Sequence, residues 1–195
     1  MRFDSRRRQL GPGPTIGCLA VAMALLLAAP VAAHETGRKL TDDELVARSS
    51  NIVRGRVTNL RSEWSLDGTH IYTFVDIRVD ESLKRSIPGN RLTLRLLGGA
   101  VGEIAMTVLG TPEFERDEEV LLFLEKNTRS FFPTVGRHEG KLTVATDAQT
   151  GGKRVEASHR PSETLQNFRS RITGLVASQA ARQSAGGGFT PSTAP

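Results

Sequence analysis

The chain has 195 residues, a formal net charge of +5, a sequence pI near 10.0 and a single cysteine, Cys18. This length fits one domain with appended segments. One cysteine excludes a disulfide scaffold and a thiolate zinc site. Because 38% of the residues are hydrophobic, a wholly disordered chain is also disfavoured.

The first 33 residues have the three parts of a signal peptide. A basic start (residues 2–8) precedes an apolar run (residues 16–29), and small residues at Val31 and Ala33 suit a signal peptidase. The run is short for a membrane-spanning helix, which needs about 20 residues. We expect cleavage after Ala33 and export to the periplasm or the medium, and the alternative is a retained N-terminal anchor. Gln9 stands where a twin-arginine motif usually has an apolar residue, which favours the Sec route.

The basicity of the chain belongs largely to this predicted signal. Residues 1–33 hold four of the 26 Lys and Arg and one of the 21 Asp and Glu, so the rest of the chain carries only +2. A nucleic-acid groove needs basic residues interleaved with stacking aromatic rings. The chain has one Tyr and one Trp, and we therefore expect no nucleic-acid partner.

A β-barrel domain with a short leading helix is predicted over residues 34–160. Thr41 is a plausible N-cap for that helix, and Glu44 stands three residues later, as in a capping box. Residues 71–79 alternate between apolar and polar side chains, which predicts a half-buried strand. Asp67 and Gly68 before it predict a two-residue hairpin turn with positive φ at both residues.

The hairpin turn fixes a register with the preceding strand. It also puts Trp64 and Leu60 on the core face, and it requires one extra residue near Thr58 and Asn59, which predicts a β-bulge there. The alternative is that the first strand ends and restarts. The expected pairs are Leu66 with Thr69, Trp64 with Ile71, Leu60 with Val75, and Val57 with Ile77.

Further strands are predicted at residues 91–96, 104–108, 120–124, 131–135 and 141–144. The run 120–124 is continuously apolar, which predicts a strand covered on both faces. Residues 161–179 predict an amphipathic helix with Ser162 as its cap, and residues 180–195 a disordered tail. The pattern predicts a mainly β fold class, a small barrel or sandwich of about five to seven short strands with a short N-terminal helix and a C-terminal amphipathic helix. The apolar stripe of the last helix comprises Leu165, Phe168, Ile172, Leu175 and Val176.

Several of these segments resemble a group of uncharacterised exported bacterial domains. The resemblance covers about residues 40 to 145 and is carried by residues 47–57, 72–79, 83–84, 98–99 and 119–124. The barrel of those domains is similar to the OB-like fold of netrin and metalloproteinase-inhibitor modules. Inhibitor modules have a cysteine at the mature N-terminus and disulfides in the barrel. The chain after residue 33 has no cysteine, so the resemblance implies a small OB-like barrel and not inhibitor-type zinc chelation.

Few residues indicate chemistry, and we predict no catalytic residue and no cofactor. The four histidines do not have metal-ligand spacing. His34 would be the mature N-terminus, where its amine and imidazole could chelate copper. The acidic runs 42–44 and 117–119 fit a first helical turn and a soluble strand entrance. The glycine-rich segment 98–102 is followed by a strand and not by a helix, so it is no phosphate loop.

We therefore expect an exported, non-enzymatic binding or accessory module whose partner is a protein or an envelope component. The candidate contacts are Tyr72 and Phe74 on an outward strand face, or the loop with Gly98, Gly99 and Gly102. Both features also fit ordinary packing, for instance under the C-terminal helix. The alternatives are a protease-associated or inhibitor-like domain and a metal-binding protein that uses His34. No stable membrane insertion is expected after cleavage, and the oligomeric state stays open.

Overall fold

The computed structural model describes residues 39–127 and 130–186. The predicted signal peptide, Cys18, His34 and residues 187–195 lie outside the described residues. The helices and strands are α2 (Asp42–Arg48), β1 (Asn51–Trp64), β2 (Ile71–Lys84), η1 (Pro88–Asn90), β3 (Arg91–Leu97), β4 (Gly99–Val101), β5 (Ile104–Met106), β6 (Glu119–Leu124), η2 (Arg137–Gly140), β7 (Lys141–Thr146), β8 (Lys153–Ala157), β9 (Arg160–Thr164) and α3 (Leu165–Gly186).

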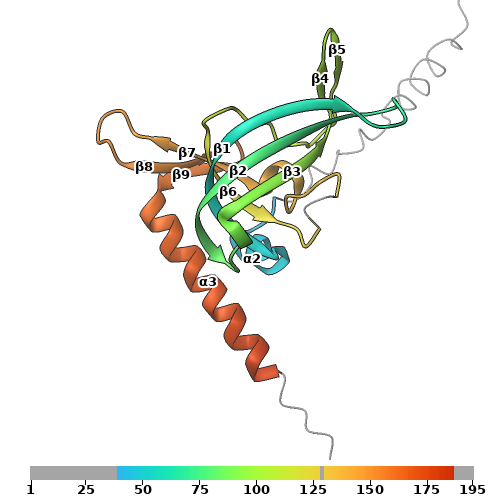
Figure 1. Cartoon of the computed structure of the whole chain (residues 1–195). Coiled ribbons are helices and arrows are strands. Elements are labelled where there is room, and N and C mark those ends of the chain that lie inside the picture. The colour runs from blue at the N-terminus through green and yellow to red at the C-terminus, as the bar shows by residue number, and fades with distance from the viewer. Residues whose placement is uncertain (1–38, 128–129, 187–195) are drawn as a thin grey trace, which may run out of the picture. The chain divides into compact units, whose positions relative to one another are not determined.

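The described region is mainly β, as predicted. Seven strands form one antiparallel sheet in the order β3-β2-β1-β6-β7-β8-β9, and β4 and β5 form a separate hairpin. Figure 1 shows β1 and β2 as two long curved strands that lie side by side. The hydrogen-bonded sheet ends at β3 on one side and at β9 on the other.

The register of the β1–β2 hairpin is confirmed. A register shift lies between Val57 and Asn59, where the bulge at Thr58 was expected. The turn differs from the prediction, because Gly68 has a φ of 67° but Asp67 has no positive φ. The Asp67 carboxylate instead accepts hydrogen bonds from residues on both sides of it. The predicted pairs that the strands contain are Trp64 with Ile71, Leu60 with Val75, and Val57 with Ile77.

One end of the hairpin extends past the core. Trp64 is 40% exposed, so the prediction that it lies in the core is wrong, whereas Leu60 does pack against buried residues. A side chain on the core-facing side of a strand is buried only where another element packs against that side. The tip residue Leu66 is fully exposed for the same reason.

Two hydrophobic clusters lie on opposite faces of the central strands. We call the first the strand cluster, because all its buried members come from β1, β2, β3 and β6, and the second the helix cluster, because α2 and α3 contribute to it. All six residues of β6 are buried, as predicted for 120–124, and residues 120–124 alternate between the clusters. In β6 the strand cluster takes Val120, Leu122 and Leu124, and the helix cluster takes Leu121 and Phe123.

The two helices have the predicted apolar faces. The backbone N–H of Glu44 donates to Thr41 Oγ1 at 3.3 Å, and the N–H of Thr41 donates to Glu44 Oε2 at 2.9 Å, so the capping box is confirmed. Phe168 and Ile172 of α3 are fully buried, and the Phe168 ring meets Phe123 edge-on at 6.4 Å. The stripe of α3 therefore packs on the sheet through the helix cluster.

Some predicted boundaries are wrong. Residues 160–164 form β9, so α3 begins at Leu165 and not at 161. In place of the predicted cap Ser162, the hydroxyl of Thr164 accepts a hydrogen bond from the backbone N–H of Asn167 in the first turn of α3. The helix also continues to Gly186, past the expected boundary at residue 180. Alanine, glutamine and arginine favour helix, which sustains these exposed turns. Residues 131–135 make only one bridge, Leu124 to Thr134, and β5 ends at Met106 and not at residue 108.

Candidate functional site

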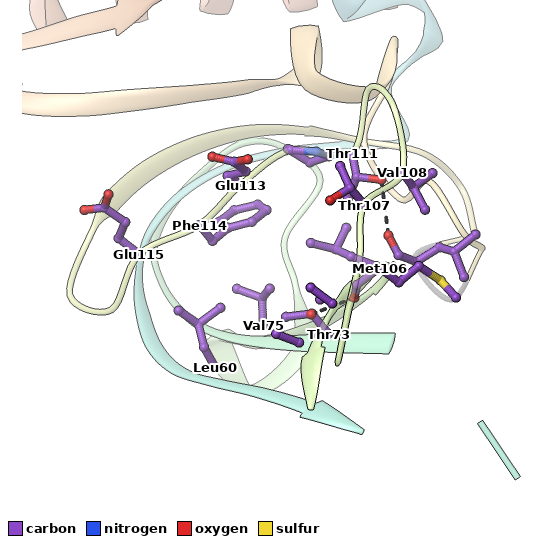
Figure 2. Close-up of a pocket in the computed structure, with 17 residues that line it drawn as sticks. Leu60, Thr73, Val75, Met106, Thr107, Val108, Thr111, Glu113, Phe114 and Glu115 are labelled. Atoms are coloured by element: carbon purple, nitrogen blue, oxygen red, sulfur yellow. Dashed lines mark hydrogen bonds between the residues drawn. The ribbon is translucent and has the colours of Figure 1, made fainter. Parts of the chain in front are cut away.

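A groove of about 530 Å³ opens beside the strand cluster. Its floor is apolar and consists of Leu60, Val75, Leu96 and Phe114. The β4–β5 hairpin forms one wall, and the segment 107–115 forms the other. Figure 2 shows Leu60 and Val75 on the floor, with Phe114 across from Met106. A concave apolar surface bordered by a few polar groups is the usual form of a binding site.

Two glycines allow the hairpin to turn over this groove. Gly98 has a φ of 105° and Gly99 a φ of 131°, which side chains rarely adopt. A Cβ at Gly99 would lie 2.1 Å from Thr73 Oγ1 and 2.7 Å from Ser62 Oγ. These hydroxyls are 2.8 Å apart, and Thr73 Oγ1 also donates to the carbonyl of Gly98 at 2.8 Å. The β4–β5 hairpin therefore packs so closely against β1 and β2 that no side chain fits at Gly99.

The predicted glycine cluster is divided by the structure. Gly98 and Gly99 line the groove, whereas Gly102 lies in the turn between β4 and β5 with a φ of 62° and no atom within 4 Å of a Cβ placed there. Gly102 thus allows the turn of the hairpin, whereas Gly98 and Gly99 form part of the wall of the groove.

The wall 107–115 is held in place by hydrogen bonds, two of which join it to segments that are distant in the sequence. Thr111 Oγ1 donates to the carbonyl of Leu97 at 3.2 Å, and Arg137 Nη1 donates to the carbonyl of Leu109 at 3.0 Å. The polar groups that line the groove are threonine hydroxyls, backbone groups and the carboxylates of Glu113 and Glu115. Its lining holds no histidine, cysteine, lysine or arginine among the described residues. This arrangement fits binding of a ligand by shape, apolar contact and negative charge.

Tyr72 and Phe74 lie on the other face of β2, because Thr73 and Val75 of the same strand line the groove. The Tyr72 ring stacks on Phe131 at 6.1 Å, and the Arg95 guanidinium lies 5.0 Å from the Tyr72 centroid.

The Phe74 ring has the Arg61 guanidinium 4.7 Å from its centroid. Both candidate rings are half-buried by these contacts, which involve neighbouring strands and the loop after β6 and not α3. The two surfaces proposed from the sequence are thus separate, and binding at either one stays a prediction.

An ionic cluster around the buried Glu119 is not predicted by the sequence pattern. The Glu119 side chain is 6% exposed and meets Arg54 at 2.6 Å, Arg56 at 3.3 Å and Lys153 at 2.6 Å. Burial alone would raise the pKa of the Glu119 carboxyl, but hydrogen bonds from Lys153 and Arg54 outweigh it and lower the pKa below its usual 4.5. The prediction that residues 117–119 only keep a strand entrance soluble is therefore wrong for Glu119.

Neighbouring charges extend this cluster to α3. Glu118 meets Lys141 at 2.5 Å, and its carboxylate accepts a hydrogen bond from Thr143 at 2.7 Å. Arg54 also contacts Glu81 at 3.1 Å, and Glu81 accepts from Arg169 Nε at 2.9 Å. The register of β1 with β6 places Arg56 opposite Glu119, so strand pairing was the signal that could have revealed the cluster.

The histidines give no metal centre in the described part of the chain. His138 and His159 have ring centroids 6.1 Å apart, and burial lowers the pKa of His159. Across residues 39–127 and 130–186, no group of three or more His, Cys, Asp and Glu is arranged to hold a metal ion. No helix in these same ranges is long and apolar enough to cross a membrane. The copper hypothesis for His34 stays untested, because His34 is not among the described residues.

Comparisons with protein-family models, with curated proteins and with solved structures give no significant match. The similarity to netrin and metalloproteinase-inhibitor modules therefore stays a prediction from the sequence.

Proposed function

We propose that this protein is an exported, non-enzymatic binding module of the cell envelope or the medium, and that its partner binds in the groove beside the strand cluster. The observation that carries the proposal is the groove of about 530 Å³, whose lining combines apolar side chains with threonine hydroxyls and carboxylates and which is walled by the hairpin that Gly98 and Gly99 allow. Export rests on the predicted signal peptide, residues 1–33. The groove is large enough to take several side chains of a partner.

We also propose that the curved part of the sheet is an open form of the predicted OB-like barrel. The arrangement of β3, β2, β1 and β6 around one buried cluster supports this reading, as does the bulge that bends β1. An OB-fold is a partly open five-stranded barrel that binds ligands on its surface. The groove beside β3, an edge strand of the sheet, fits such an opening.

A variant that fills the groove tests the binding proposal. Ala105 is exposed on β5 and lines the groove, so Ala105→Trp places a large ring there without replacing a buried residue. Ala177→Trp on the exposed side of α3 is the matched control. The protein and both variants are used to capture partners from the periplasmic and medium fractions of the source organism. We expect the original protein and the control to retain the same partner and Ala105→Trp to lose it. Equal capture by Ala105→Trp, or no specific capture at all, would contradict the proposal.

The export proposal has its own measurement. Intact mass spectrometry of the protein recovered outside the cytoplasm should give a chain that begins at His34. A full-length chain found only inside the cytoplasm would contradict it.

A further inference from the structure

We propose that the occupant of the groove is an extended segment of a partner protein in which apolar and basic side chains alternate. This inference rests on the proposed function and adds the chemistry of the partner. Its apolar side chains would contact the partly exposed apolar side chains of the groove, Leu60, Met106 and Phe114, and its Lys or Arg side chains would lie beside Glu113 and Glu115.

The charge of the rim favours a basic partner. Glu113 and Glu115 are exposed, and neither has an ion-pair partner among the described residues. In the same segment Glu118 and Glu119 are paired with cations, whereas the exposed Asp117 has no ion pair among the described residues either. Two neighbouring carboxylates that form no ion pair attract cations and repel anions at such a surface, although the Lys141 ammonium lies 5.2 Å from the Phe114 ring centroid.

The spacing of Glu113, Phe114 and Glu115 also fits a partner that carries both apolar and basic side chains. Phe114 stands between Glu113 and Glu115, and its ring packs against the strand cluster. Figure 2 shows the Phe114 ring on the groove side of this segment, with both carboxylates beside it at the rim. A ligand that covers the ring therefore passes close to two negative charges. Lys and Arg suit this place, because their apolar stems cover hydrocarbon while their charged ends stay in water.

The β4–β5 hairpin favours an extended partner. Each strand has three residues, and β5 pairs with no described strand except β4. The other edge of β5 thus offers backbone donors and acceptors, and Ile104 is 57% exposed. A two-stranded hairpin is marginal on its own, and a peptide can add to a free edge as a third strand. Successive side chains of that peptide would point to opposite faces, which matches an alternating sequence.

Three labelled hexapeptides test the chemistry of the partner. They alternate valine with lysine, with glutamine or with glutamate, and binding is measured by fluorescence anisotropy in low salt. We expect the lysine peptide to bind most tightly and the glutamate peptide most weakly. Since exposed ion pairs are weak, replacing both rim carboxylates should lower the affinity for the lysine peptide roughly threefold to thirtyfold. The double variant is Glu113→Gln with Glu115→Gln.

A second double variant controls for the change in net charge. Asp43→Asn with Glu63→Gln removes two exposed carboxylates that do not line the groove, and this variant should bind like the original protein. High salt should reduce the advantage of the lysine peptide, because it screens exposed charges. Hydrogen exchange with the bound peptide should show new protection at residues 104–106.

The outcomes separate this inference from the proposed function. Equal binding of the glutamine and lysine peptides, or no effect of the rim variant, overturns the basic partner. No new protection at residues 104–106 overturns strand addition. In each case a natural partner whose capture Ala105→Trp abolishes would leave the proposed function standing. If Ala105→Trp also leaves capture unchanged, the proposed function fails as well.

Discussion

Glu119→Gln is the sharpest test of how this fold is held together. The substitution keeps the shape of the side chain and removes its charge, so Arg54, Arg56 and Lys153 lose the carboxylate between them. These four residues come from β1, β6 and β8, three strands that are distant in the sequence. The variant therefore reports on the assembly of the sheet and not on one local element.

The expected loss of stability follows from the exposure of the partners. Removing one member of a fully buried ion pair costs about 3–5 kcal/mol, whereas an exposed pair contributes at most about 1 kcal/mol. The Glu119 side chain is 6% exposed, but those of Arg54, Arg56 and Lys153 are 19%, 39% and 43% exposed. Because water can solvate the freed cations, we expect the free energy of unfolding to fall by about 2 kcal/mol.

Urea denaturation at pH 7, followed by circular dichroism, measures this loss. Glu156→Gln on β8 is the control, because Glu156 is exposed and has no ion pair in the described part of the chain. The control should change the free energy of unfolding by less than about 0.5 kcal/mol. A Glu119→Gln variant as stable as the control would refute the reasoning that the cluster stabilises the sheet.

The pH dependence provides a second check on the same variant. Since the pKa of Glu119 is lower in the folded state, its stabilising contribution is complete above its unfolded pKa of about 4.5. The contribution is lost as the pH falls from there through the lower folded pKa. The difference in stability between the original protein and Glu119→Gln should thus be constant near neutral pH and shrink below pH 4.5. A difference that grows on acidification would contradict the direction of the pKa shift.

Two further substitutions test the hairpin and the helix contacts. Gly99→Ala should destabilise the protein by about 2 kcal/mol more than Gly102→Ala, because a Cβ at Gly99 would lie 2.1 Å from Thr73 Oγ1 and one at Gly102 meets nothing within 4 Å. Equal losses in urea denaturation would argue against the close approach of the hairpin to β2. Phe168→Ala should cost about 3–5 kcal/mol, since this fully buried ring packs on Phe123, whereas Phe131→Ala, at a ring 48% exposed, should cost clearly less. Thermal unfolding of both variants measures the contrast, and a larger loss for Phe131→Ala would contradict the position of α3 on the sheet.

The parts of the fold that depend on neighbours in sequence were predictable. The alternation of residues 71–79 and the turn at Gly68 were enough to give the pairs of β1 with β2 and the bulge at Thr58. The continuous apolar run of β6 was enough to place it between two covered faces. The turn residues themselves were predicted less well, because side-chain hydrogen bonds to Asp67 select a different turn.

The candidate site was only partly predictable. Gly98 and Gly99 belong to the loop predicted as a candidate contact, and they do line the groove. The floor was not foreseen, because Leu60 and Phe114 are far apart in sequence and meet only once the strand cluster has formed. The significance of Glu113 and Glu115 likewise depends on the tertiary structure, which places both carboxylates in the lining of the groove.

The sequence by itself determined the mainly β class, the register of the first hairpin, the cap of α2 and the apolar stripe of α3. Each of these depends on side-chain periodicity or on residues within one turn of each other, so the local pattern contains the information. Only the tertiary structure decided that Trp64 is exposed, that Glu119 is buried among three cations, and that a groove opens beside β3. Those features depend on which distant segments cover a given face, and that is settled when the whole sheet packs.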